Sequence, residues 1–169
     1  MLFISHSAKD KAEALDIQRR LLERGYDAAQ LFLDSDAESG IPAGSKWEQV
    51  LYARLKGCRA LIVLCSENWQ QSKWCFAELV YAKAMGKEVF PVLLEACDIG
   101  GVAGEHQGVL VYKEGEAAYA RLWAALESRH LGPHVLSLLR SMLFQFTPSY
   151  SRFSPVSHAT SSSSFASQV

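Results

Sequence analysis

The chain has 169 residues, of which 49% are apolar, with 17 lysines and arginines against 18 aspartates and glutamates. This length predicts one domain, and the apolar content is enough for a core. The balanced charge gives no sign of a nucleic-acid partner or of a basic face for membranes. Residues 1–7 do not form a secretion leader, and residues 135–146 are too short and too polar to cross a bilayer, so we expect a cytoplasmic protein.

The cysteines show no C-x-x-C pairing and stand in largely apolar surroundings. We therefore expect buried thiols in a reducing compartment, and no metal site. The cysteines are Cys58, Cys65, Cys75 and Cys97.

Short apolar runs predict the strands of a sheet that is covered on both faces. These runs are residues 1–4, 30–33, 58–65, 88–94 and 109–112. The fourth run contains Pro91, which lacks a backbone donor and weakens the prediction there.

Apolar residues at three-and-four spacing predict helices between the strands, over residues 9–24, 45–57, 73–85 and 114–129. In the first helix Ala14, Ile17 and Leu21 form the inward stripe, which Leu15 and Leu22 widen. Ser72 and Gly86 have the residue types that begin and end the third helix. The inward residues expected in the last helix are Ala117, Ala118, Leu122, Trp123 and Leu126.

The domain is expected to span residues 1–130. Residues 131–146 have the composition of one extra helix, and the Ser-rich residues 147–169 are typical of a disordered tail. Residues 34–44, rich in turn-forming types, are predicted to form a long loop, and such loops often carry function.

Successive β/α units predict a single α/β domain with a flavodoxin-like, doubly wound, five-stranded parallel sheet in the order 2-1-3-4-5. In this order ligands bind outside the carboxyl ends of strands one and three, where the strand order reverses. The loops that follow these strands are residues 5–9 and 66–72.

Glu78 is the candidate catalytic residue of this crevice. At a spacing of four residues, Trp74 and Glu78 share one face of the third helix, which leaves the loop after strand three. A pair of this kind in isolation is more often a solvated charge beside a packing residue. Its position at the predicted crevice favours a functional role for Glu78.

Several other site types are disfavoured by their missing motifs. The glycines of residues 100–104 lack the spacing of a phosphate-binding or dinucleotide-binding loop. The acidic residues of a receiver domain are missing after strands one and three, and no G-x-S-x-G motif supports a serine hydrolase. His130 and His134 are separated by Gly132 and Pro133, which break the helix that a metal pair would need.

Three motifs resemble a TIR (Toll and interleukin receptor) domain of the bacterial type. They are residues 3–7 with Asp10, residues 33–34 and 41–44 with Trp47, and residues 72–79. They stand in order within about residues 1–130, and the resemblance implies the same fold as the strand pattern does.

The resemblance implies an NAD+-cleaving enzyme that breaks the nicotinamide–ribose bond, releasing nicotinamide and ADP-ribose or a cyclic ADP-ribose isomer. NAD+ is then the substrate, and no cofactor is expected. Glu78 is implied as the essential glutamate. The implied substrate contacts are Trp74, Ser5, His6, Ser7, Asp34 and Lys46.

The family also associates with itself through the loop after strand two, called the BB loop. Here the loop residues implied in self-association are Asp36, Ile41, Pro42, Gly44 and Trp47. We expect such assembly, as a homo-oligomer or filament, to activate NAD+ cleavage in bacterial antiphage defence.

Two alternatives stay open. The chain could be a non-catalytic module that only binds other TIR domains in signalling, or the N-terminal piece of a larger sensor protein. The complete third motif, with Glu78, favours the enzyme.

Overall fold

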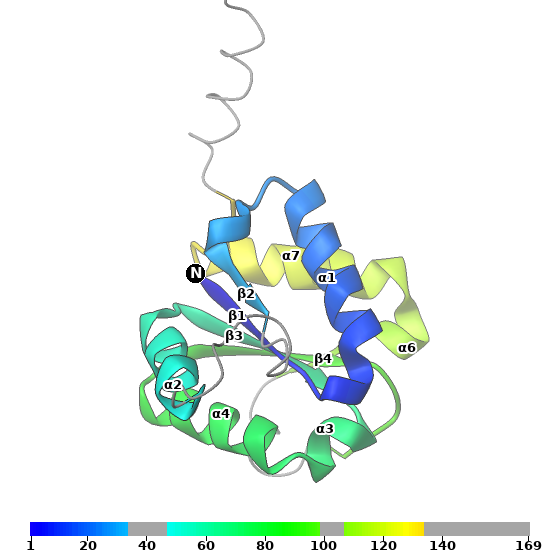
Figure 1. Cartoon of the computed structure of the whole chain (residues 1–169). Coiled ribbons are helices and arrows are strands. Elements are labelled where there is room, and N and C mark those ends of the chain that lie inside the picture. The colour runs from blue at the N-terminus through cyan, green and yellow to red at the C-terminus, as the bar shows by residue number, and fades with distance from the viewer. Residues whose placement is uncertain (34–46, 99–106, 134–169) are drawn as a thin grey trace, which may run out of the picture.

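The computed structural model describes residues 1–33, 47–98 and 107–133 (Figure 1). Parallel strands form one sheet in the order β2-β1-β3-β4-β5, which confirms the predicted topology. The strands are β1 (Leu2–Ser5), β2 (Leu31–Leu33), β3 (Ala60–Cys65), β4 (Glu88–Leu93) and β5 (Val109–Leu110).

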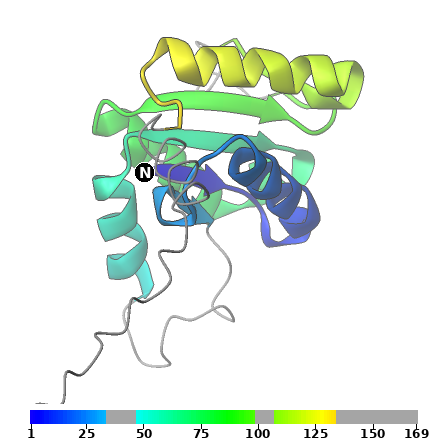
Figure 2. The same ribbon diagram turned by 90° about the horizontal axis from the view of Figure 1, so that it is seen from above.

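Helices cover both faces of this sheet. They are η1 (Ala8–Asp10), α1 (Lys11–Glu23), η2 (Ala28–Gln30), α2 (Trp47–Gly57), α3 (Glu67–Gln71), α4 (Lys73–Ala84), α6 (Val111–Glu114) and α7 (Glu116–Ser128). Helices α1 and α7 lie on one face, and α2, α3 and α4 lie on the other (Figures 1 and 2).

Successive side chains of β1 point to opposite faces of the sheet, so they pack alternately under the two helix layers. Leu2 and Ile4 belong to the core under α1 and α7. Phe3 belongs to the core under α2 and α4, together with Leu79 of α4. Ser5 comes two residues after Phe3 and therefore points toward the α4 side of the sheet.

The ends of the first and third predicted helices are confirmed. Helix α1 is followed by Gly25 at φ 92°, and α4 by Gly86 at φ 66°, a backbone region that favours glycine. The Ser72 hydroxyl caps α4 by accepting a hydrogen bond from the backbone N–H of Cys75. In α1, however, Leu15 and Leu22 are exposed, so the prediction that they widen the inward stripe was wrong.

The last strand is shorter than predicted. Residues 109–112 were expected to be a strand, but β5 ends at Leu110, opposite Leu93, which is the last residue of β4. Val111 has no strand residue beside it and instead begins the short helix α6. Gly115, at φ 53°, separates α6 from α7, so the predicted helix over residues 114–129 is divided. Ala117 of α7 is exposed, contrary to expectation.

Pro91 is accommodated inside β4. Strand β5 pairs with β4 only at Val92 and Leu93. Within the described residues, the part of β4 before Val92 therefore has a neighbouring strand on one side only, which is β3. A residue without a backbone donor is tolerated where one side of a strand is open.

Some predictions lie outside the described residues. These are the loop of residues 34–44, the start of the second helix at residues 45–46, residues 134–146 of the extra helix expected over residues 131–146, and the tail of residues 147–169. Within the described ranges, no helix combines the length and the apolar composition that crossing a membrane requires.

Candidate active site at the ends of β1 and β3

Buried polar side chains gather where β1 and β3 end. They are Ser5, His6, Ser7, Asp10, Ser66 and Glu78, and each is at most 8% exposed. Burying polar groups is costly unless they are hydrogen-bonded, so a cluster of this kind indicates a site and not a plain core. It lies at the point where the strand order reverses, as predicted.

Glu78 lies on the inner side of α4, with an exposed fraction of 0%. Its neighbours on that side of the helix, Cys75, Leu79 and Ala82, are buried as well. The alternative interpretation of Glu78 as a solvated surface charge was therefore wrong.

The Ser5 hydroxyl donates a hydrogen bond of 2.5 Å to Oε2 of Glu78. Strand β1 supplies the donor and α4 supplies the acceptor, so the contact joins the sheet to the helix layer. A short bond of this type is typical of a hydroxyl that donates to a charged carboxylate.

Trp69 contacts the same serine. Its indole Nε1–H donates to the Ser5 Oγ at 3.3 Å, and the side chain is only 4% exposed. Trp69 belongs to α3, a short helix within the segment that was predicted to be a loop, so this residue was missed. The signal that could have found the helix is Ser66, a common N-cap type, followed at once by an acidic residue.

Asp10, in η1 after β1, links this part of the chain to α3 by hydrogen bonds. Its carboxylate accepts hydrogen bonds from the Ser66 hydroxyl at 2.5 Å and from the Asn68 amide at 2.8 Å. The Ser66 hydroxyl also accepts the backbone N–H of Trp69 at 3.0 Å, which makes Ser66 the N-cap of α3. The backbone that carries Trp69 is thus held by side chains from η1 and α3.

The other predicted site residues of the loop after β1 are Ser7 and His6, and their hydrogen bonds differ from those of Ser5. The Ser7 hydroxyl caps η1 by accepting from the backbone N–H of Lys9 at 3.4 Å. The His6 carbonyl accepts a hydrogen bond from the Cys75 thiol at 3.3 Å, and this contact links the loop to α4. The His6 side chain is buried.

Trp74 lies one turn before Glu78 but is 43% exposed. The two side chains therefore differ in exposure, although their spacing of four residues places them on the same side of the helix. The side chains of Asp34, Asp36, Ile41, Pro42, Gly44, Lys46 and Trp47 lie outside the described residues.

The thiol at the end of β3 does not offer a nucleophile, because burial raises the pKa of Cys65 to about 12. Burial also raises the pKa of Cys97. No group of three histidine, cysteine, aspartate or glutamate side chains in the described ranges could hold a metal ion.

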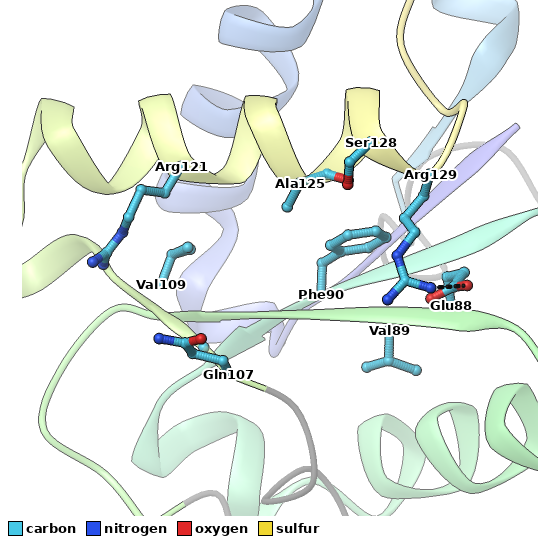
Figure 3. Close-up of a pocket in the computed structure, with 10 residues that line it drawn as sticks. Glu88, Val89, Phe90, Gln107, Val109, Arg121, Ala125, Ser128 and Arg129 are labelled. Atoms are coloured by element: carbon cyan, nitrogen blue, oxygen red, sulfur yellow. Dashed lines mark hydrogen bonds and ion pairs between the residues drawn. The ribbon is translucent and has the colours of Figure 1, made fainter.

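A separate cavity of about 410 Å³ lies between α7 and the first part of β4 (Figure 3). Figure 3 shows the Phe90 ring between Arg121 and Arg129. Both arginines are paired with glutamates, Arg129 with Glu88 at 2.9 Å and Arg121 with Glu114. The cavity shares no residue with the buried polar cluster, and its charges are balanced by their own neighbours, so we place the candidate site at the cluster.

Comparison with known proteins identifies the family. Residues 2–123 match a family model described as the TIR domain. A search of curated protein sequences found no match.

Similar solved structures include the following three. The TIR domain of the Toll-related receptor TRR-2 from Hydra magnipapillata has 13% sequence identity and a TM-score of 0.58, covering 75% of this chain and 97% of that one. The CMP N-glycosidase BcmB from Clostridium botulinum has 17% identity and a TM-score of 0.49, covering 70% and 94%. The TIR domains of the activated Roq1 resistosome have 20% identity and a TM-score of 0.46, covering 84% and 76%. The first of these matches shows the shared fold, and the family model, which covers most of the chain, shows that this chain belongs to the TIR domain family.

Proposed function

We propose that this chain cleaves NAD+ at the bond between nicotinamide and ribose, with Glu78 as the catalytic residue. The observation that carries the proposal is the buried Glu78 carboxylate, hydrogen-bonded to Ser5 at the strand ends where this fold binds ligands. Membership of the TIR family supports this proposal, because the resemblance implies NAD+ cleavage, an activity that many members of the family have.

The chemistry suits a single carboxylate. When the bond between the ribose C1′ and the pyridinium nitrogen breaks, both electrons leave with the nitrogen and nicotinamide departs as a neutral molecule. Positive charge then grows on the ribose, and a nearby carboxylate stabilises that charge. Water adds to C1′ and loses a proton to give ADP-ribose, or a nucleophile of the same molecule closes a cyclic isomer.

Ser5 indicates how the ribose would be held. A ribose hydroxyl is the same kind of O–H donor as the Ser5 hydroxyl, and a carboxylate has about four acceptor sites. Glu78 can therefore bind a ribose hydroxyl in addition to Ser5. Because Glu78 is fully buried, substrate binding must first uncover it.

The remaining parts of the proposal rest on the resemblance. Trp74, His6, Ser7, Asp34 and Lys46 would contact NAD+, and no cofactor is needed. Other copies of the domain would be the protein partners, bound through the BB loop, and cytoplasmic antiphage defence would be the setting.

An interaction module without catalysis is the second candidate. Large apolar side chains on α4 favour it, since Trp74, Phe76 and Val80 are 43%, 50% and 44% exposed. Phe76 and Val80 are four residues apart and share one side of the helix, and exposed apolar residues on one side of a helix are typical of contact surfaces between proteins.

Nicotinamide release by the purified chain, followed by chromatography at high protein concentration, separates the two candidates. We expect Glu78→Gln to lower the rate by roughly 100-fold or more, because the electrostatic stabilisation is lost while the side-chain shape is kept. The matched control is Glu67→Gln, which changes an exposed glutamate on α3 and should retain the parent rate. If the folded parent releases no nicotinamide at any concentration, the interaction module is the better description.

A further inference from the structure

The contact between Trp69 and Ser5 assigns a role to a residue that the motifs did not indicate. An indole N–H can only donate a hydrogen bond, whereas a serine hydroxyl has one proton and two acceptor sites. Ser5 therefore accepts from Trp69 at 3.3 Å and keeps its single proton for Glu78, at 2.5 Å.

We propose that Trp69 is a positioning residue that orients Glu78 through Ser5, directing the Ser5 proton onto the Glu78 carboxylate. This inference rests on the proposed function of Glu78. Without the indole N–H the Ser5 hydroxyl is free to rotate toward other acceptors. Hydrogen bonds arranged in a chain also polarise one another, so the Trp69 donor strengthens the bond from Ser5 to Glu78.

The surroundings of Trp69 suit such a role. Its backbone N–H is bound by Ser66, and Ser66 is bound in turn by Asp10, so α3 is fixed to the loop that follows β1. The indole is 4% exposed and packs in the same core cluster as Leu79 of α4. Trp69 can therefore hold the orientation of Ser5 without contacting the substrate.

The consequence concerns the charge of Glu78. A hydrogen bond donated to a carboxylate favours the ionised form, so losing the oriented Ser5 proton makes Glu78 easier to protonate. Other ionisable groups belong to the elements around it: His6 after β1, Asp10 in η1, Cys65 on β3, Cys75 on α4 and the half-buried Tyr52 on α2. A test must therefore observe Glu78 itself as well as the rate.

Trp69→Phe is the first variant, because it removes the N–H and keeps an aromatic ring. We expect kcat for nicotinamide release to fall about fivefold at neutral pH with little change in KM, and the acid limb of the pH profile to move up by about 0.5 to 1 unit. Trp123→Phe is the matched control: this tryptophan is buried on α7, across the sheet, and its loss should leave the acid limb in place.

A double-mutant cycle tests whether Trp69 acts through Ser5. In a Ser5→Ala background, Trp69→Phe should have no further effect on kcat or on the acid limb. An equal loss with and without Ser5 would overturn the proposal, as would a loss of activity with an unmoved acid limb. If Trp69→Phe does not fold, benzothienylalanine at position 69 replaces the N–H by sulfur at nearly constant shape.

Carbon-13 NMR of labelled glutamate carboxyl groups gives a readout that does not need activity. Glu78→Gln identifies the Glu78 signal by its disappearance, and we expect this signal to titrate at higher pH in Trp69→Phe than in the parent. If the parent cleaves no NAD+ but the titration shifts, the proposed function fails and the positioning role stands. If the parent is active and the titration does not shift, the positioning role fails alone.

Discussion

Ser66 shows how much of the site depends on single hydrogen bonds. Its hydroxyl accepts the backbone N–H of Trp69 as the N-cap of α3 and donates to the buried carboxylate of Asp10. Ser72 caps α4 in the same way, through the backbone N–H of Cys75 at 3.3 Å, and among the described residues its hydroxyl has no hydrogen bond to a buried carboxylate.

The two serines should therefore differ when each is changed to alanine. Ser72→Ala should lower the free energy of unfolding by about 1 kcal/mol, as expected for the loss of an N-cap. Ser66→Ala should cost about 1 kcal/mol more, because it also leaves Asp10 short of a donor in a buried place. Urea denaturation followed by circular dichroism measures both values, and equal losses would show that the bond to Asp10 contributes nothing to stability.

At this scale the sequence identified some site residues and not others. Glu78 could be predicted because its helix, its cap and its position after strand three are local features. The partner Ser5 could be placed at the same crevice, since parallel strands end at the same edge of a sheet. Asp10 belongs to the first motif, but its contact with Ser66 and the contact of Trp69 with Ser5 could not be foreseen, because each joins segments more than 50 residues apart in sequence.

At the scale of elements, the contact between α1 and α7 depends on Arg20. Its guanidinium binds Asp16 of the same helix at 2.7 Å and Glu116 of α7 at 2.8 Å, and it lies 4.1 Å from the centre of the Tyr119 ring. Arg19 binds Asp16 and Glu23 at 2.5 Å each, and both partners belong to α1. Arg20 therefore joins two helices, and Arg19 joins turns of one.

Arg20→Met should lower the free energy of unfolding by about 1 kcal/mol, from the loss of the ring contact and of an ion pair between helices. Arg19→Met is the matched control and should change stability by less than about 0.5 kcal/mol, because exposed pairs within one helix contribute little. Thermal and urea unfolding of the two variants provide the comparison. A larger loss for Arg19→Met would contradict this account of the helix contact.

The contact between Arg20 and Asp16 predicts that the stability of the fold depends on pH. Hydrogen bonds from Arg20, and secondarily from Arg19, lower the pKa of Asp16. A carboxyl group whose pKa is lowered by folding stabilises the folded state above its unfolded pKa of about 3.9, and this contribution is lost as the pH falls through its folded pKa. The stability difference between the parent and Arg20→Met should therefore narrow on the acid side of about pH 4.

Local sequence patterns predicted most elements but failed where tertiary pairing decides. The strand expected over residues 109–112 has β-forming residues throughout, yet β4 offers partners only to Val109 and Leu110. The length of a neighbouring strand is invisible to a propensity argument, so α6 and the break at Gly115 could not be foreseen.

At the scale of the whole molecule, the topology brings the functional residues together. Strands β1 and β3 lie side by side although more than 50 residues separate them, and α4, the second helix after β3, places Glu78 over the end of β1. The fold could be predicted because each βα unit is encoded locally and the handedness of the crossovers limits the possible orders.

Complementation between two inactive variants tests whether assembly completes the site. One variant is Glu78→Gln, and the other is Ile41→Asp, which places a charge in the loop proposed to mediate self-association. If the loop of one copy completes the site around Glu78 of its neighbour, a mixed assembly contains some sites with an intact loop and an intact Glu78. Each variant alone should be inactive, and the mixture should regain part of the parent rate of nicotinamide release, increasing with concentration.

The control mixes Glu78→Gln with Glu78→Ala, a pair that can never restore a complete site. Analytical ultracentrifugation of each mixture shows whether assembly itself has formed. Assembly of the first pair without any recovered turnover would mean that each copy builds its site alone, with Ile41 acting only within its own chain. Recovery in the first pair and none in the control would mean that catalysis belongs to the assembly, so that activity responds to the local concentration of the protein.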